Sequence, residues 1–183
     1  MKTDYFDYDL PEELIAQTPP DKRTNSRLMI LDRQSGQIID DHFYNLPAYL
    51  TANDILVFND TLVIPARLFG VKTDTGARIE ILLLKEEAGG WEVLARPARR
   101  LKPGTVIDFN GIMTGEIVEK RDEGRCLVRF DYEGIFLEVL ERLGKIPLPP
   151  YIRGEIDDPG RYQTVYAARA GSAAAPTAGL HFD

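Results

Sequence analysis

Hydrophobic residues in the middle of the chain recur in short runs separated by turns rich in glycine, aspartate and asparagine. Many short β-type runs without a helical pattern between them are typical of an antiparallel sandwich or barrel. The pattern therefore predicts a mainly antiparallel, barrel-like β domain over residues 66–145. The runs are Leu62–Phe69, Ala77–Lys85, Trp91–Ala95, Thr105–Phe109, Ile112–Glu119 and Arg125–Phe130.

The flanking sequence mixes strands with helical turns. Residues 11–16 and 45–50 predict short helical turns, because a proline lies in the first turn of each. Ile55–Phe58 is wholly apolar, and we expect a buried strand over residues 54–59. Strands are also predicted at Leu28–Leu31 and Gln37–His42, and a helix over residues 135–143, before Gly144. We expect residues 1–65 and 146–183 to form one discontinuous α/β main domain, into which the β domain is inserted.

Composition excludes several classes of protein. The chain has 183 residues, 44% of them hydrophobic, and a formal net charge of −7, so a general basic face for nucleic acid is not expected. One cysteine, Cys126, and two histidines argue against disulfides and against a metal site. No apolar run is long enough to cross a bilayer, and we expect a cytoplasmic protein. No two glycines stand two positions apart, so a Gly-x-Gly nucleotide loop is absent.

Four segments carry side chains that suit neither a simple core nor a simple surface: residues 23–28, 58–61, 147–153 and 161–182. The second follows an apolar run, and ligands of open α/β sheets bind where strands end. The fourth contains a loop of small residues, which lets the backbone approach a ligand closely. Each also has a structural interpretation. In chain order these are solvated arginines, a turn at a strand end, a proline connector, and a histidine with one satisfied hydrogen bond.

Residues 175–182, Ala-Pro-Thr-Ala-Gly-Leu-His-Phe, resemble the signature of the S-adenosylmethionine:tRNA ribosyltransferase-isomerases of queuosine biosynthesis. Ala173 and Asp183 stand where the family pattern has Val and Thr. Family members are longer, so we expect that a C-terminal half is missing from this sequence and that the 183-residue stretch alone is inactive. Six further segments agree with the family in order: Phe6–Pro11, Ser26–Leu28, Val57–Thr61, Pro65–Leu68, Leu148–Ile152 and Arg161–Tyr166.

The resemblance implies a reaction. The family joins the ribosyl part of S-adenosylmethionine to 7-aminomethyl-7-deazaguanine at the wobble position of a tRNA, which gives epoxyqueuosine-tRNA and releases adenine and methionine. S-adenosylmethionine is consumed as a ribosyl donor, and we expect a monomer that needs no metal. The carbon beside the sulfonium must lose a proton, which requires a positioned base. His181 is the first candidate for acid–base catalysis and Asp60 the second; Asp60 could instead hold the ribose hydroxyls.

The remaining site residues are predicted from the same motifs. Arginines can bind the methionine carboxylate or tRNA phosphates, and tyrosines can stack on adenine or on an anticodon base. For Tyr151, stacking on proline is the structural alternative. The predicted substrate-binding residues are Arg23, Arg27, Asn59, Thr61, Arg67, Tyr151, Arg153, Arg161, Tyr162, Gln163, Tyr166, Ser172, Thr177 and Gly179.

The predicted β domain carries a basic run over residues 96–102, called the basic loop below. Its cations are Arg96, Arg99, Arg100 and Lys102. Small barrels often bind looped RNA, so we predict that this loop contacts tRNA phosphates; a solvated loop is the alternative. A second hypothesis for the whole chain is a non-catalytic RNA-binding module, which would bind RNA without binding S-adenosylmethionine.

Overall fold

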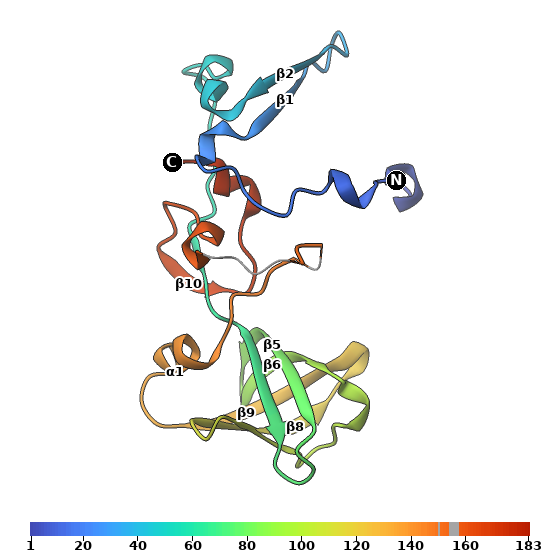
Figure 1. Cartoon of the computed structure of the whole chain (residues 1–183), viewed down its shortest axis with the longest axis vertical. Helices are drawn as coiled ribbons and strands as arrows, with labels where there is room; N and C mark the ends of the chain where they lie inside the picture. The colour runs from blue at the N-terminus through green and yellow to red at the C-terminus, as the bar shows by residue number, and fades with distance from the viewer. Residues whose placement is uncertain (150, 154–157) are drawn as a thin grey trace. The chain divides into compact units, whose positions relative to one another are not determined.

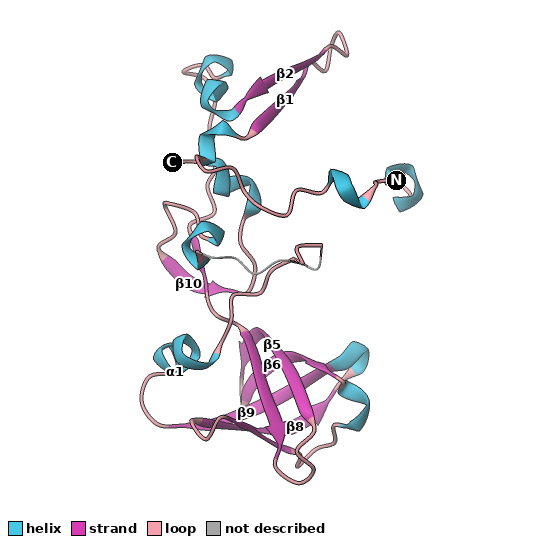
Figure 2. Ribbon diagram, in the orientation of Figure 1, coloured by secondary structure: helices cyan, strands magenta, loops and turns pink. Residues whose placement is uncertain are grey.

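The computed structural model describes residues 1–149, 151–153 and 158–183, and Pro150 of the predicted proline-rich segment lies outside them. The chain divides into two compact units (Figures 1 and 2). The barrel prediction is confirmed, whereas the contacts group residues 57–65 and 159–180 with the barrel and not with the rest of the flanking sequence. Unit 1 comprises Met1–Leu56, Pro149–Asp158 and His181–Asp183, and unit 2 comprises Val57–Leu148 and Pro159–Leu180.

Unit 2 is built on a closed barrel of six antiparallel strands in the order β4-β5-β6-β9-β8-β7 (Figure 2). The barrel closes where β7 pairs with β4, with Val71 opposite Asp108 and Lys72 opposite Ile107. Closure leaves no unpaired strand edge, which would otherwise expose a row of backbone donors and acceptors. The strands are β4 (Arg67–Lys72), β5 (Arg78–Glu87), β6 (Gly90–Arg96), β7 (Val106–Phe109), β8 (Met113–Lys120) and β9 (Arg125–Tyr132).

Alternation along the strands fills the barrel. In β4, Leu68 and Gly70 point inward while Phe69 and Val71 are exposed, as the two-residue period of a strand requires. Gly70 is required by close packing: a Cβ there would lie 2.7 Å from the Asp108 carbonyl oxygen. Core side chains with 2% exposure or less include Leu68, Ile79, Ile81, Leu83, Val93, Leu101, Ile107, Phe109, Met113, Ile117, Cys126 and Val128.

One α-helix, α1 (Phe136–Leu143), follows the barrel and confirms the predicted helix. Its buried residues Val139 and Leu140 join the barrel core. The Gly144 N–H donates to the Leu140 carbonyl (2.7 Å) and ends the helix. Gly144 has a negative φ of −88°, so the position does not need the left-handed conformation. It needs space, because a Cβ there would overlap the carbonyl group of Pro65.

A small parallel sheet completes unit 2. Strand β3 (Thr61–Val63) pairs with β10 (Arg169–Ser172), with Arg169 opposite Thr61 and Ser172 opposite Val63. The register shifts between Ala170 and Ser172, where Gly171 has a φ of +147°. A bulge of this kind favours glycine, because other residues rarely adopt that backbone conformation.

Unit 1 contains one hairpin, formed by β1 (Arg27–Leu31) and β2 (Ile38–His42), which confirms the two predicted strands. The remaining helical segments are short 3₁₀ turns: η1 (Thr3–Phe6), η2 (Glu12–Leu14), η3 (Arg23–Asn25) and η4 (Phe43–Tyr49) in unit 1, η5 (Ala98–Arg100), η6 (Asp122–Gly124) and η7 (Pro159–Tyr162) in unit 2, and η8 (Thr177–His181).

Two expectations for the flanking sequence are not met. Residues 54–59 form no strand; the side chains of Ile55 and Val57 are 88% and 91% exposed. An apolar run becomes a buried strand only when another strand pairs with it, and none of the described residues does so. The predicted α/β main domain is likewise not evident, because α1 is the only α-helix among the described residues and lies in the predicted insertion. No helix of the described residues is long and apolar enough to span a membrane.

Candidate functional site

His181 lies in a local cluster of unit 1 together with residues of the loop before β1. Its Nδ1 is 2.9 Å from the Ser26 hydroxyl, and its ring lies against Phe43 with centroids 5.5 Å apart. Phe43 also contacts Phe182 edge-on, at 4.8 Å. The half-buried imidazole is therefore held by one hydrogen bond and one aromatic contact.

The hydrogen bonds of Ser26 determine which ring nitrogen of His181 carries the proton. The Ser26 hydroxyl donates its only hydrogen to the Arg23 carbonyl oxygen, at 2.8 Å. It must then accept from His181, so Nδ1 bears the hydrogen and Nε2 keeps its lone pair. A neutral histidine in this tautomer can take up a proton at Nε2, which is the state that a general base requires.

Among the other predicted residues of unit 1, Arg23 is half-buried like His181, and Arg27, Tyr151 and Arg153 are exposed. Arg27 lies 3.7 Å from Asp40, and Arg153 donates to Glu12 at 2.6 Å. Gln17 holds the backbone beside Arg153: its amide oxygen accepts the Arg153 N–H at 2.9 Å, and its amide nitrogen donates to the Tyr151 carbonyl at 3.0 Å. This segment is thereby fixed to the turn after η2, with the Tyr151 ring exposed.

Asp60 lies in unit 2, directly before β3. Its backbone carbonyl accepts the N–H groups of Ala168 (2.8 Å) and Arg169 (3.2 Å), which fixes the start of the β3–β10 pair. Its half-exposed carboxylate is 3.5 Å from Arg169 Nε. The Asn59 side chain accepts the Thr61 N–H at 3.0 Å, an Asx-type turn. The predicted trio of residues 59–61 thus forms a turn that presents a solvent-accessible carboxylate.

Two motif residues of unit 2, Gln163 and Ser172, use their side chains for hydrogen bonds to the protein backbone. The Gln163 amide accepts the Val63 N–H (3.0 Å) and donates to the Val63 carbonyl (2.7 Å). The Ser172 hydroxyl donates to the Ala174 carbonyl (2.8 Å) and accepts the Ala174 N–H (3.1 Å). These contacts stabilise the β3 backbone and the loop after β10. Direct binding of substrate by Gln163 and Ser172 stays a prediction.

Gly179 is packed against Tyr166 and Thr164. A Cβ at Gly179 would overlap the Tyr166 hydroxyl and lie 2.9 Å from Thr164 Cγ2, so only glycine fits. Tyr166 also contacts Phe58 edge-on, with centroids 4.9 Å apart. The missing side chain at Gly179 therefore leaves space for the Tyr166 hydroxyl, which belongs to the preceding motif.

The last three predicted residues of this group lie on 3₁₀ turns: Arg161 and the buried Tyr162 on η7, and the exposed Thr177 at the start of η8. Sequence reasoning left Ser26 and Arg169 out of the site. Ser26 lies within a quoted motif and within segment 23–28, and Arg169 lies within segment 161–182, but neither was singled out there.

The cations of the basic loop are exposed to solvent, so they are accessible to a phosphate, and their contact with tRNA stays a prediction. All four cations, Arg96, Arg99, Arg100 and Lys102, are exposed, and no ion pair is found for them among the described residues. Leu101 between them is fully buried, and the Lys102 N–H donates to the Thr105 hydroxyl at 3.1 Å. The loop is thus anchored to the barrel while its charges point to solvent.

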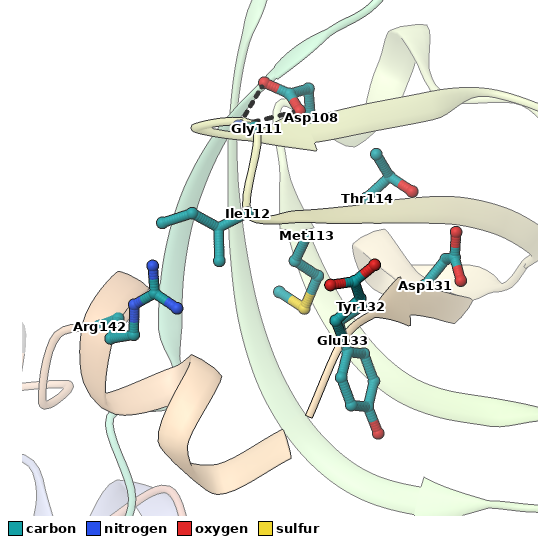
Figure 3. A pocket seen from close by; sticks show the side chains of 9 residues that line it. All are labelled: Asp108, Gly111, Ile112, Met113, Thr114, Asp131, Tyr132, Glu133 and Arg142. Atoms are coloured by element: carbon teal, nitrogen blue, oxygen red, sulfur yellow. Dashed lines mark hydrogen bonds between the residues drawn. The ribbon is translucent and has the colours of Figure 1, made fainter. Parts of the chain in front are cut away.

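A hollow of about 570 Å³ on the barrel is lined mainly by acidic side chains, in contrast to the basic loop (Figure 3). Three carboxylates, those of Asp108, Asp131 and Glu133, line it beside Arg142. Both oxygens of Asp108 accept the Gly111 N–H, at 3.2 Å. An acidic lining repels phosphate, so this side of the barrel does not suit RNA.

Cys126 and His42 both lie in structural surroundings. Cys126 is buried in the barrel, and burial raises the pKa of its thiol. His42 stacks on Tyr44, with ring centroids 5.3 Å apart. Within the described part of the chain, no three His, Cys, Asp or Glu side chains form a group that could hold a metal ion.

Comparison with known proteins identifies the family. Residues 3–183 match the family of queuosine biosynthesis proteins, and the chain therefore belongs to that family. A similar solved structure is that of an S-adenosylmethionine tRNA ribosyltransferase from Thermotoga maritima. It is 40% identical, the match covers 68% of this chain, and the TM-score is 0.32. The match spans 44% of that chain, which is less than half of its length.

Proposed function

We propose that this member of the queuosine biosynthesis family provides part of an enzyme that transfers and isomerises the ribosyl group of S-adenosylmethionine. The acceptor is 7-aminomethyl-7-deazaguanine at the wobble position of tRNA, and the products are epoxyqueuosine-tRNA, adenine and methionine. The observation that carries the proposal is the family match over residues 3–183, which includes His181 in a tautomer suited to proton uptake.

His181 acts in this proposal as the general base. A sulfonium group acidifies the neighbouring C–H, and a neutral imidazole with a free Nε2 can accept that proton. Ser26 is a positioning residue, because it fixes the ring through Nδ1. Asp60 binds the ribose hydroxyls through its half-exposed carboxylate or, in its protonated form, donates a proton to the departing adenine.

Substrate binding draws on the other motif residues. Guanidinium groups pair with carboxylates in a two-pronged geometry, which suits the methionine end of S-adenosylmethionine. Arg23, Arg27, Arg67, Arg153 and Arg161 are the candidates. Tyrosine rings can stack on adenine, for which we propose Tyr151 and Tyr166. The basic loop would contact tRNA phosphates.

The predicted α/β main domain stays part of this proposal. The related ribosyltransferase is longer than the match, which covers 44% of it. We propose that residues 1–65 and 146–183 form that domain together with sequence that this chain does not span.

The test is a turnover assay on the intact protein with an anticodon stem-loop that carries the 7-aminomethyl base and ribose-labelled S-adenosylmethionine. His181→Ala should lower turnover roughly 10²- to 10⁴-fold. Affinity for both substrates should change little, because a base acts mainly on the transition state. His42→Ala is the matched control, since the exposed His42 ring stacks on the exposed Tyr44 and the variant should leave turnover intact.

Normal turnover in His181→Ala would refute the assignment of the base, and Asp60→Asn would be the next variant. A fall in melting temperature together with weaker S-adenosylmethionine binding would instead indicate that His181 braces its loop. RNA binding by the intact protein without any affinity for S-adenosylmethionine would favour the alternative, a non-catalytic RNA-binding module.

A further inference from the structure

An exposed aromatic ring lies among cations on the outer face of the barrel. In the strand register, Phe69 of β4 faces Glu80 of β5, which in turn faces Arg96 of β6. In the next row, Val71 of β4 faces Arg78 of β5. Phe69 is 48% exposed, a high value for a phenylalanine on a paired strand. We call these five residues the Phe69 face.

A hollow of about 550 Å³ lies over the Phe69 face, and all five residues line it. This volume is in the range of small-ligand sites. Asp108 of β7 and Asn110 in the turn that follows β7 complete its wall. The hollow is thus floored by an aromatic ring and a β-branched side chain, with cations on the β5 and β6 side.

The two arginines of the Phe69 face can bind an anionic partner. Arg78 and Arg96 are exposed, and no ion pair is found for either within the described part of the chain. Glu80 is directed to Arg67, at 3.5 Å. Asp108 accepts the Gly111 N–H with both oxygens. Both arginines are therefore available, while each carboxylate already has a partner.

The Phe69 face is continuous with the basic loop. Arg96 ends β6, lines the hollow, and is the first cation of the loop that continues through Lys102. Asp108 separates this hollow from the acidic one of Figure 3, since it lines both. One hollow of the barrel thus combines an exposed ring with two arginines and two carboxylates, whereas the acidic hollow has three carboxylates and one arginine.

We propose that the Phe69 face binds an unpaired nucleotide of the RNA substrate, with its base stacked on Phe69 and the adjoining phosphates on Arg78 and Arg96. Stacking on an exposed aromatic ring between arginines is the usual way in which barrels and sheets hold unpaired bases. That this RNA is a tRNA rests on the proposed function. The stacking site itself rests on the strand register, the hollow and the charges.

The experiment measures binding of an anticodon stem-loop to the intact protein, with 2-aminopurine in the loop to report stacking. Phe69→Leu keeps an apolar side chain and removes the ring; it should weaken binding about 5- to 150-fold and abolish the change in 2-aminopurine fluorescence. Phe69→Trp should restore both. Tyr132→Leu is the matched control, because Tyr132 is an exposed ring that lines the acidic hollow. This variant should leave RNA affinity and the 2-aminopurine signal unchanged.

Salt dependence separates the two kinds of contact. Arg78→Gln should lower the slope of log affinity against log salt by about 0.7, because one phosphate contact is lost. Phe69→Leu should leave the slope unchanged, since a stacked base displaces no counterion. Phe69 is exposed, so the melting temperature should stay close to that of the unaltered protein in each variant.

Unchanged RNA affinity in Phe69→Leu would overturn the stacking site. So would a concentration-dependent dimer that Phe69→Leu dissociates without weakening RNA binding, since the face would then serve a second copy. The proposed function can fail separately: RNA binding that depends on Phe69, in a protein that does not consume S-adenosylmethionine, would refute the enzyme and keep the stacking site.

Discussion

Replacing Ser26 by alanine should change the tautomer of His181. The Ser26 hydroxyl is the acceptor of the Nδ1 hydrogen at 2.9 Å, because its own hydrogen goes to the Arg23 carbonyl. A hydrogen bond of this kind contributes about 0.5–1.5 kcal/mol net. Its loss should shift the ratio of the two neutral tautomers toward Nε2–H by about 2- to 12-fold.

The assay is a two-dimensional NMR correlation of the imidazole nitrogens and carbon-bound hydrogens, recorded at a pH where the ring is neutral. Ser26→Thr keeps the hydroxyl and should preserve the original tautomer. Ser35→Ala is the control, because Ser35 bonds only to nearby groups of its own turn, at 2.9 Å from Asp32. Identical His181 nitrogen shifts in the original protein and Ser26→Ala, or a proton already on Nε2, would refute the reasoning.

Three further predictions concern the barrel, the hairpin and the basic loop. Leu68→Ala, at a fully buried position, should lower the free energy of unfolding by about 2–5 kcal/mol in chemical denaturation. Hydrogen bonds from Tyr49 foremost, and from Asn45, lower the pKa of the Asp41 carboxyl in the folded protein. The stabilisation from this carboxylate is therefore present above its unfolded-state pKa and is lost as the pH falls through its folded-state pKa. Asp41→Asn should remove this part of the acid dependence of unfolding. Replacing the three arginines of the basic loop by alanine should weaken tRNA binding and flatten its salt dependence, while S-adenosylmethionine affinity, measured by calorimetry, stays unchanged.

The barrel could be predicted because its information is local. Strand β4 and the first half of β5 alternate between buried and more exposed residues, and turns such as that at Gly76 separate the strands. Closure of β7 on β4 is not local: it depends on the fit of Gly70 against the Asp108 backbone, which no periodicity reveals. The number of strands was therefore predictable, whereas their order around the barrel was not.

The run Ile55–Phe58 illustrates the opposite case. Its composition is that of a buried strand, and composition alone led to that prediction. A strand is stabilised by neighbouring strands as well as by its own side chains, and the described residues supply none here. A sequence pattern reports what a segment can become, whereas a strand also requires a neighbouring strand, which the pattern does not report.

The candidate site shows the same division between residue type and contact. Motif matching pointed to His181 and Gln163 alike, yet the structure gives them different surroundings. Gln163 uses its amide oxygen and nitrogen on the Val63 backbone, so removing it should first affect β3. His181 uses only Nδ1, on Ser26, and its other nitrogen keeps a lone pair. A proton acceptor needs such a free atom, and for this reason the hydrogen-bond pattern, beyond the motif itself, favours His181 as the base.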